Sequence, residues 1–454
     1  MPQFTRREFL GSAAIFAARP LFAAVAPTVR RWPYERSDGT ATDNVWVRRV
    51  HLDLAGRLPT AAEAKDFVRS KAKDKRAALV DRLLASDACA DYWSMRFCDI
   101  LRVKSEFPIN LWPNAVYVYH RRIRDFVRDD EPWDRFARTL LTSSGSDFRD
   151  AEANFFRATA RRTPEGLAET ALLTFLGENW NGVPGASIKA IAPYFANVQV
   201  KNTREWKEEI VTVEGDDRRG EFCDRLLGEW RRPFAAAFVQ RIDHWLFGLD
   251  KPVPAHVTAF IRNGFRLKPL LRTLVLSQDY ARGPVTGGFR CRRLDAEVLD
   301  DTLCDLTGMT RDYQSIAPEP FSFLPGKRRT VAIEDGSITS AFLLLFGRPA
   351  RDSGRLAERR NGISAKQRLY LFNSGKLYQS LAKIAKNDAV FRRLPVEKKV
   401  DRLYWRCLSR PPSENERHRL LARFRSLPNG KERWEFQRDL AWALVNSREF
   451  LCQH

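Results

Sequence analysis

The 454-residue sequence contains few of the residues that bind metal ions, with six histidines and seven cysteines. The cysteines form no CxxC pair, and the histidines form neither HxH nor HExxH. Zinc sites and c-type haem sites use such spacings, so we predict no metal and no cofactor. An odd number of cysteines leaves at least one outside any intramolecular disulfide, and buried thiols are the simplest expectation. The cysteines lie at positions 89, 98, 223, 291, 304, 407 and 452.

The sequence also lacks the common catalytic motifs and long apolar runs. It contains no G-x-S-x-G, no phosphate-binding loop and no dinucleotide fingerprint, which disfavours the usual hydrolases, kinases and dehydrogenases. A bilayer span requires about 20 consecutive apolar residues. The apolar run at 11–18 is shorter and is followed by Arg19 and Pro20. We therefore expect no transmembrane span.

Acidic residues are in the minority. Asp and Glu number 56 against 77 Lys and Arg, which gives a net charge of +21. Such a charge favours negatively charged partners. The basic residues are spread along the chain, and no helix-turn-helix, zinc finger or aromatic RNA-binding motif occurs, so we expect no nucleic-acid partner. Two explanations remain open, namely a salt-bridged helical surface and an acidic glycan or envelope partner.

The N-terminal residues have the layout of an export signal. Arg6 and Arg7 precede a weakly apolar stretch, and small residues around Ala24 and Ala26 suit cleavage. Paired arginines, a short apolar region and a small-residue exit are typical of a twin-arginine signal peptide. We predict that residues 1–26 form this signal and that the protein is exported to the periplasm or cell surface. A basic N-terminal tail is the alternative.

Apolar residues recur at helical spacing through most of the chain, which predicts a mainly α fold of two packed helical domains. We expect a linker at 27–41, an N-terminal helical domain at 42–180, a loop and β insertion at 181–220, and a C-terminal helical domain at 221–454. The small β element near 196–215 follows from the alternating segments 196–200 and 209–213. Predicted helices cover residues 75–86, 114–128, 164–177, 233–247, 267–277, 292–307, 364–385, 396–408 and 431–447.

One pattern recurs along the chain. The stretch Gly56–Glu63 parallels Ser409–Glu416, and both contain an N-cap hydroxyl three residues before a glutamate. This is the capping box that starts a helix. A looser third copy begins near Gly248. We infer a recurring three-helix unit in which the last helix ends in an apolar-x-Ser turn. Chance similarity among proline-terminated helices is the alternative.

Several stretches resemble known bacterial domains. RRVHLDLAGRLPT at 48–60, LVDRLLAS at 79–86 and NLWPNA at 110–115 resemble the planctomycete-specific cytochrome-associated domain of unknown function. FGRPARD at 346–352 and the ending NSREFL at 446–451 resemble the planctomycete-specific domain that follows it. The resemblance covers nearly all of residues 42–454 and implies an exported protein of bacteria related to Planctomycetes and Verrucomicrobia. It implies no particular activity.

The sequence departs from this family at one informative place. Many relatives carry a CxxCH-like segment after the helix that corresponds to 168–177, and this chain reads GENWNG at 177–182. Haem-linked electron transfer therefore lacks its ligands at this position.

Two groups of residues are candidate binding sites. Arg348, Arg351 and Asp352 follow an apolar helix, and arginine forks bind carboxylate, sulfate or phosphate; Asn373 is a further candidate. An internal ion-pair network that includes Glu358 and Arg359 is the alternative reading of this segment.

The second group is Asn110, Trp112, Asn114 and His120, where a loop enters a helix. A tryptophan beside polar side chains suits a sugar ring, although a tryptophan before a proline also fastens loops to cores.

Carboxylates occur beside another tryptophan at 205–209 (EWKEE). A glycosidase needs two carboxyl groups on either side of a bound sugar, and a solvated charge run is the alternative. Asp53 and Asp81 lie within predicted helices and are expected to pair with nearby arginines.

We interpret the protein as an exported envelope binding or assembly component that recognises acidic polysaccharide or an exported enzyme partner. A component of polysaccharide breakdown is the alternative, and an electron-transfer accessory protein ranks below it; whether the chain is an enzyme, and its oligomeric state, stay undecided.

Overall fold

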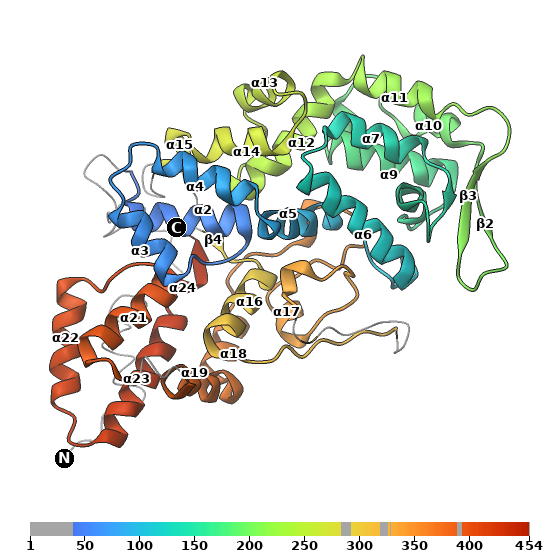
Figure 1. Cartoon of the computed structure of the whole chain (residues 1–454). Coiled ribbons are helices and arrows are strands. Elements are labelled where there is room, and N and C mark those ends of the chain that lie inside the picture. The colour runs from blue at the N-terminus through green and yellow to red at the C-terminus, as the bar shows by residue number, and fades with distance from the viewer. Residues whose placement is uncertain (1–39, 283–291, 318–325, 327, 388–392, 454) are drawn as a thin grey trace.

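The computed structural model describes residues 40–282, 292–317, 326, 328–387 and 393–453. The predicted signal residues Arg6 and Arg7, and Cys291, lie outside these residues. The chain is mainly α-helical, as the sequence predicts (Figure 1). Within the described residues, no helix has the length and apolar character that crossing a membrane requires.

The first half of the chain forms the upper part of the molecule in Figure 1. Helices α2 to α5 are followed by α6, α7 and the short α8, and α9 completes this group. Their bounds are Asp43–Ala55 (α2), Ala61–Arg69 (α3), Lys75–Leu84 (α4), Asp87–Ile100 (α5), Pro113–Arg128 (α6), Trp133–Thr142 (α7), Asn154–Arg157 (α8) and Pro164–Leu176 (α9). A continuous apolar core runs through them and includes the fully buried Trp93, Trp133 and Phe97.

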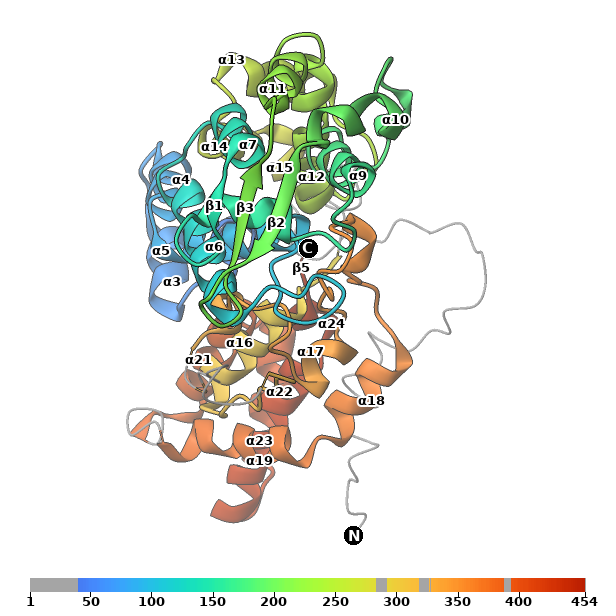
Figure 2. The same cartoon turned by 90° about the vertical axis from the view of Figure 1, so that its right-hand side faces the viewer.

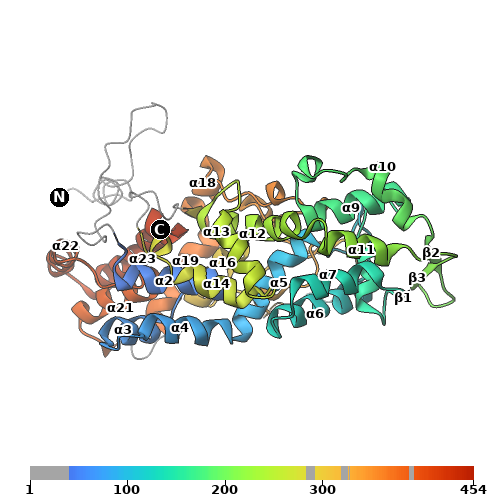
Figure 3. The same ribbon diagram turned by 90° about the horizontal axis from the view of Figure 1, so that it is seen from above.

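A small sheet marks the far end of this half. Strands β2 (Val198–Asn202) and β3 (Glu209–Val213) form an antiparallel hairpin, with Val200 opposite Val211. The sequence predicts both strands, and β2 begins two residues later than the predicted strand at 196–200. It does not predict β1 (Gly145–Ser146), which pairs with β3, because two residues are too few to show alternation. In Figure 3 the hairpin and helix α22 (Glu414–Arg425) lie at opposite ends of an elongated molecule.

The segment before the hairpin differs from expectation. Residues 181–195 contain helix α10 (Ile188–Ile191) and the 3-10 turn η3 (Ala192–Phe195). The Ser187 hydroxyl accepts a hydrogen bond from the Ala190 N–H and so caps α10, and Pro193 suits the first turn of η3. These capping signals outweigh the glycines and prolines that favour a loop.

The next helices return to the first group. They are α11 (Arg219–Leu227), α12 (Arg231–Phe247), α13 (Pro254–Arg262), α14 (Leu267–Val275) and α15 (Gln278–Ala281). Helix α11 packs against α7, α12 packs against α9, and α14 packs against α4. Residues 219–281 therefore share the core of the N-terminal helices.

The remaining helices form the lower part of Figure 1. They are α16 (Ala296–Thr307), α17 (Ala341–Leu345), α18 (Ala365–Asn373), α19 (Gly375–Asn387), α21 (Val396–Leu408), α22, α23 (Gly430–Val445) and α24 (Arg448–Leu451). The predicted helix 364–385 is divided at Ser374, which has an extended conformation between α18 and α19. Among the residues of 308–336 that the structure describes, the one helical element is the 3-10 turn η5 (Thr330–Ala332).

The recurring pattern in the sequence corresponds to recurring local structure. Gly56 and Ser409 both adopt left-handed backbone conformations, with φ of 55° and 58°. The arginine that follows each of them, Arg57 or Arg410, forms two hydrogen bonds to the capping-box glutamate. The matched stretches therefore share backbone conformation and side-chain hydrogen bonds, which supports a common unit rather than chance similarity.

The serine turns in the three copies of the unit form the same hydrogen bonds. Ser86, Ser277 and Ser447 each accept a hydrogen bond from the N–H three residues later. Each serine N–H in turn donates to the carbonyl of a leucine three residues earlier. One residue type therefore performs both tasks in all three copies.

The described cysteines are all buried. Burial raises the pKa of the Cys98 and Cys407 thiols to about 12, so they stay protonated at neutral pH. They behave as apolar core residues, as the sequence predicts.

The chain is closed by contacts between its first and last described elements. A two-stranded sheet pairs β4 (Arg292–Arg293) with β5 (Cys452–Gln453). The Gln453 side chain donates to the Arg49 carbonyl in α2. Arg48, also in α2, is only 2% exposed and donates to the carbonyls of Cys407 and Phe450 at 3.0 and 2.9 Å. Figure 2 shows α24 and β5 inside the molecule, between the two groups of helices.

Candidate functional site

The first candidate group lies inside the protein. Arg348 is 6% exposed and Arg351 is fully buried. The Arg351 Nε lies 2.9 Å from Asp99 Oδ1 in α5, and its Nη1 donates to the carbonyls of Val103 and Glu334. Gly336 makes this approach possible, since a Cβ there would lie 2.6 Å from the Arg351 Cδ.

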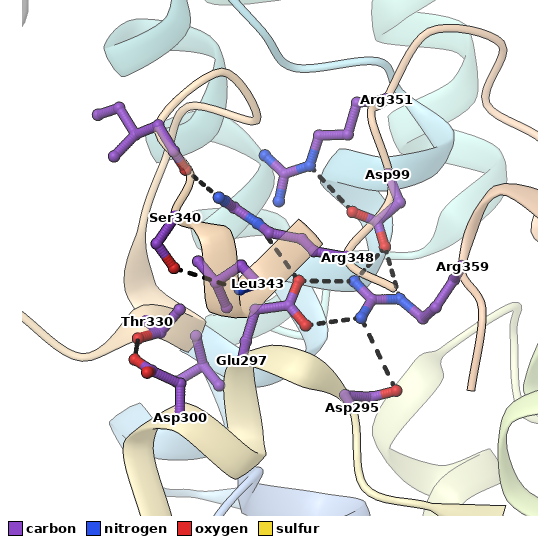
Figure 4. Close-up of polar contacts among 12 residues, drawn as sticks. Asp99, Asp295, Glu297, Asp300, Thr330, Ser340, Leu343, Arg348, Arg351 and Arg359 are labelled. Atoms are coloured by element: carbon purple, nitrogen blue, oxygen red, sulfur yellow. Dashed lines mark hydrogen bonds and ion pairs between the residues drawn. The ribbon is translucent and has the colours of Figure 1, made fainter. Parts of the chain in front are cut away.

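Arg348 and Arg351 belong to a larger set of buried charges, which we call the arginine–carboxylate network (Figure 4). Its centre is Arg359, whose guanidinium forms ion pairs of 2.6 Å with Asp99 and 2.7 Å with Glu297, and lies 3.7 Å from Asp295. Glu297 also faces Arg348 Nε at 3.5 Å. The network consists of Arg96, Asp99, Asp295, Glu297, Arg348, Arg351 and Arg359.

The electrostatics of the network favour the charged forms of its carboxylates. Burial by itself would raise the pKa of Glu297, but Arg359 and Arg348 hold that pKa below its usual value. Asp295 is affected in the same direction, because Arg96 and Arg359 outweigh its burial. The network thus connects α5 with α16 and with the segment 346–360.

The internal alternative for this segment therefore describes Arg348 and Arg351 better than a surface anion site does. Asp352 and Glu358, which this alternative places in an internal ion-pair network, have partners outside the arginine–carboxylate network. Asp352 pairs with Lys104 at 2.7 Å, and Glu358 accepts a hydrogen bond from the Asp352 N–H. Asn373 is exposed at the end of α18, away from Arg351 in the core.

The second candidate group divides between the surface and the interior. Trp112 is partly exposed at the N-cap of α6, and Asn110 and Asn114 are exposed on either side of it in the sequence. His120 is 4% exposed. Burial and the positive charge of Arg351 lower its pKa to about 3, so its imidazole is neutral at physiological pH and does not belong to the surface around Trp112.

The tip of the β2–β3 hairpin lies against Trp112. The Trp206 ring packs edge-on to the Trp112 ring, with centroids 4.8 Å apart, and Trp206 is 57% exposed. The Lys207 ammonium lies 5.6 Å from the Trp112 centroid and 5.9 Å from the Trp206 centroid. Lys207 reaches this place from a left-handed backbone conformation with φ of 66°. We call Trp112, Arg204, Trp206 and Lys207 the hairpin face.

The carboxylates of the hairpin are directed away from this face. Glu205 pairs with Arg149 at 2.7 Å. Glu208 is 4% exposed and accepts hydrogen bonds from the hydroxyls of Ser146 and Thr203. Glu209 forms ion pairs with Arg157 and Arg162. The three acidic groups of the 205–209 segment are therefore each engaged by protein groups.

Two cations at the tip of the hairpin, Arg204 and Lys207, differ from its carboxylates in their partners. Arg204 and Lys207 are exposed, and neither has a carboxylate within ion-pair distance in the part of the chain that the structure describes. The hairpin face therefore presents two indole rings and two cations to solvent. Phe107, 85% exposed in the loop before Trp112, and Tyr117, 38% exposed in α6, add aromatic surface close by in the sequence.

The two isolated helix aspartates are paired as predicted. Asp53 forms an ion pair with Arg292 and accepts a hydrogen bond from the Tyr280 hydroxyl. Asp81 pairs with Arg272 at 2.6 Å.

In the described residues, no group of three or more His, Cys, Asp or Glu side chains is placed to hold a metal ion. Where relatives carry the CxxCH-like segment, the Glu178 carboxylate accepts a hydrogen bond from the Leu356 N–H. This hydrogen bond connects the two halves of the chain.

Sequence reasoning found both tryptophans but not their contact. Trp112 and Trp206 are 94 positions apart in the numbering, and no periodic signal connects them. Arg204 was missed altogether, although it lies one residue before the acidic run. The carboxylate partners Asp99 and Glu297 were also missed, because helix patterns do not show which helices meet.

Fold and surface together define a mainly α-helical protein of two connected parts that carries an exposed aromatic and cationic face on a β-hairpin. Residues 35–179 match the PSCyt2 family, described as a protein of unknown function (DUF1549), and residues 229–424 match the PSD1 family, also of unknown function (DUF1553). The chain thus carries a PSCyt2 domain followed by a PSD1 domain, which confirms the resemblance seen in the sequence. Searches of curated proteins and of solved structures gave no match.

Proposed function

We propose that this protein is an exported binding protein that recognises acidic polysaccharide through the hairpin face. The observation that carries the proposal is the contact of Trp112 with Trp206 beside Lys207. Indole rings stack on the apolar faces of sugar rings, and a cation beside them pairs with a uronate or sulfate group.

The charge arrangement supports an acidic rather than a neutral ligand. Glu205 and Glu209 pair with arginines, and Glu208 is buried against the Ser146 and Thr203 hydroxyls, so the exposed groups at the tip that have no ion-pair partner among the described residues are Arg204 and Lys207. A neutral glucan would use the rings alone and would bind independently of salt. An acidic glycan uses both, and its affinity falls as salt screens the cations.

The same arrangement favours binding over hydrolysis. A glycosidase requires one carboxyl as an acid and a second as a base or nucleophile, both facing the sugar. Glu208 is buried against the Ser146 and Thr203 hydroxyls, and Glu205 is held by Arg149. The hairpin therefore supplies contact groups but no carboxylate pair facing a ligand on its surface.

The binding proposal is tested by titrating the protein with alginate, chondroitin sulfate and a neutral β-glucan while tryptophan fluorescence is followed. We expect saturable binding of one of the acidic glycans, weaker binding at high salt, and little response to the glucan. Trp206→Ala should weaken binding at least about fivefold, since removal of a stacked indole ring costs about 1 kcal/mol or more. Lys207→Ala should weaken it less and reduce its salt dependence.

The matched control is Lys201→Ala, on the same hairpin. Lys201 is 55% exposed and is paired with Glu214, so its removal should leave glycan binding unchanged. Equal binding by the parent protein and the Trp206→Ala variant, with both folded, would contradict the proposal. Turnover of any glycan, seen as new reducing ends, would instead support the hydrolase alternative.

Export is supported by Arg6 and Arg7 and the small residues before Ala26. Fusion of residues 1–26 to a reporter tests this part. Retention of the reporter in the cytoplasm would contradict it.

A further inference from the structure

A second surface, far from the hairpin, combines exposed aliphatic side chains with unpaired cations. Nine large hydrophobic residues are exposed in the described part of the chain, and four of them lie within residues 344–370. They are Leu344 at 63%, Ile363 at 49%, Leu369 at 58% and Tyr370 at 40% exposure. Exposed apolar residues that gather in this way mark a contact surface.

Packing brings the segments that carry these residues together. The Tyr370 ring in α18 lies 5.8 Å from the Phe342 ring in α17, and the Gln367 amide of α18 donates to the Leu345 carbonyl. The Arg360 N–H donates to the Gly347 carbonyl, which brings the residues before α18 beside the end of α17. Figure 2 shows α17 and α18 side by side at the edge of the lower part.

The sequence around α18 is rich in cations. Residues 359–387 contain seven Lys and Arg and no Asp or Glu. Arg360, Lys366 and Arg368 are exposed, and none of them has a carboxylate within 4 Å among the described residues. Most other arginines form ion pairs, for example Arg359 in the buried network. We call Leu344, Arg360, Ile363, Lys366, Arg368, Leu369 and Tyr370 the α17–α18 face.

We propose that the α17–α18 face docks the protein on the surface of an anionic phospholipid bilayer. Cations attract the headgroups, while aliphatic and tyrosine side chains enter the boundary between headgroups and acyl chains. A polysaccharide has no apolar phase that could bury Leu344 and Leu369, which distinguishes this face from the hairpin face. The bilayer supplies negative headgroups for the cations of the face and an apolar layer for its exposed aliphatic side chains.

The experiment is flotation of the full-length protein with vesicles of phosphatidylglycerol and phosphatidylcholine, compared with vesicles of phosphatidylcholine alone. We expect binding to the anionic vesicles that decreases with salt, and weak binding to the neutral ones. Leu344→Glu/Leu369→Glu should reduce binding at least about tenfold, because it places two carboxylates at the contact. Lys366→Glu/Arg368→Glu should also reduce it, by about fivefold or more for each cation.

The matched control is Leu249→Glu/Lys251→Glu, in the loop between α12 and α13. Leu249 is also exposed, at 38%, and Lys251 is exposed beside it, but their loop leads into α13, which lies at the top of the molecule in Figure 1. This control and Trp206→Ala should float as the parent protein does, which separates the bilayer proposal from the glycan proposal. Circular dichroism melting of each variant identifies any loss of folding.

Two results would overturn the proposal. One is equal flotation with neutral and anionic vesicles. The other is unchanged flotation of the folded Leu344→Glu/Leu369→Glu variant. A concentration-dependent dimer that disappears in this variant, without any vesicle binding, would assign the face to a second copy of the chain.

Discussion

Replacing Glu297 by alanine is expected to lower the free energy of unfolding by about 3–5 kcal/mol. Glu297 is fully buried and forms a 2.7 Å ion pair with Arg359 while facing Arg348 at 3.5 Å. Its removal leaves two buried guanidinium groups short of negative charge, and an uncompensated buried charge is far costlier than a lost surface pair. Urea denaturation followed by circular dichroism measures the change.

The control for this prediction is Glu221→Ala. Glu221 pairs with Arg218 at 2.8 Å, but its side chain is 55% exposed, so we expect a change of at most about 1 kcal/mol. The double variant Glu297→Met/Arg359→Met should be less destabilised than the sum of its single variants, because the two residues interact directly. Additive effects would show that the ion pair contributes no coupling energy.

The direction of the pH dependence follows from the same network. Arginines hold the pKa values of Glu297 and Asp295 below their usual values. The stabilisation that these carboxylates provide is fully present above the usual carboxyl pKa near 4, and it is lost as the pH falls through the lower pKa values of the folded state. The difference in stability between the parent and Glu297→Ala should therefore be largest at neutral pH and should shrink in acid.

Arg48→Ala is expected to lower the free energy of unfolding by about 3 kcal/mol. Arg48 is almost fully buried, and its guanidinium donates to the carbonyls of Cys407 and Phe450. Each buried carbonyl that loses its donor costs about 1–3 kcal/mol. We also expect faster proteolysis of residues 396–453, measured by mass spectrometry of the fragments, because Arg48 fastens them to α2.

Arg417→Ala is the matched control for Arg48→Ala. Arg417 forms a 2.8 Å pair with Asp401 at the surface, with its side chain 37% exposed, and should contribute at most about 1 kcal/mol. If both arginine variants melt alike, the contacts of Arg48 do not hold the C-terminal helices to α2.

Local signals in the sequence predicted local structure well. The capping boxes at Thr60 and Ser413 form as expected, each with reciprocal hydrogen bonds. The periodic stretch at 396–408 is helix α21 to the residue. Such signals act between residues a few positions apart, where chain connectivity already brings the groups together.

Contacts between distant segments could not be predicted in this way. Trp112 meets Trp206, and Arg351 meets Asp99, only because helices and loops pack in one particular arrangement. An internal ion-pair network within residues 351–359 is one interpretation of the sequence, but Asp352 pairs with the distant Lys104. Amphipathic patterns show which side of a helix is buried but do not identify the neighbour that covers it.

The contact of α2 with β5 and α24 has a consequence for synthesis. Arg48 and Arg49 leave the ribosome about 400 residues before their partners at 449–453. Helix α2 therefore stays incompletely packed until nearly the whole polypeptide has been synthesised. A prematurely terminated product would lack the segment that closes the core. Under the export proposed above, a route that accepts only folded cargo would discard such fragments.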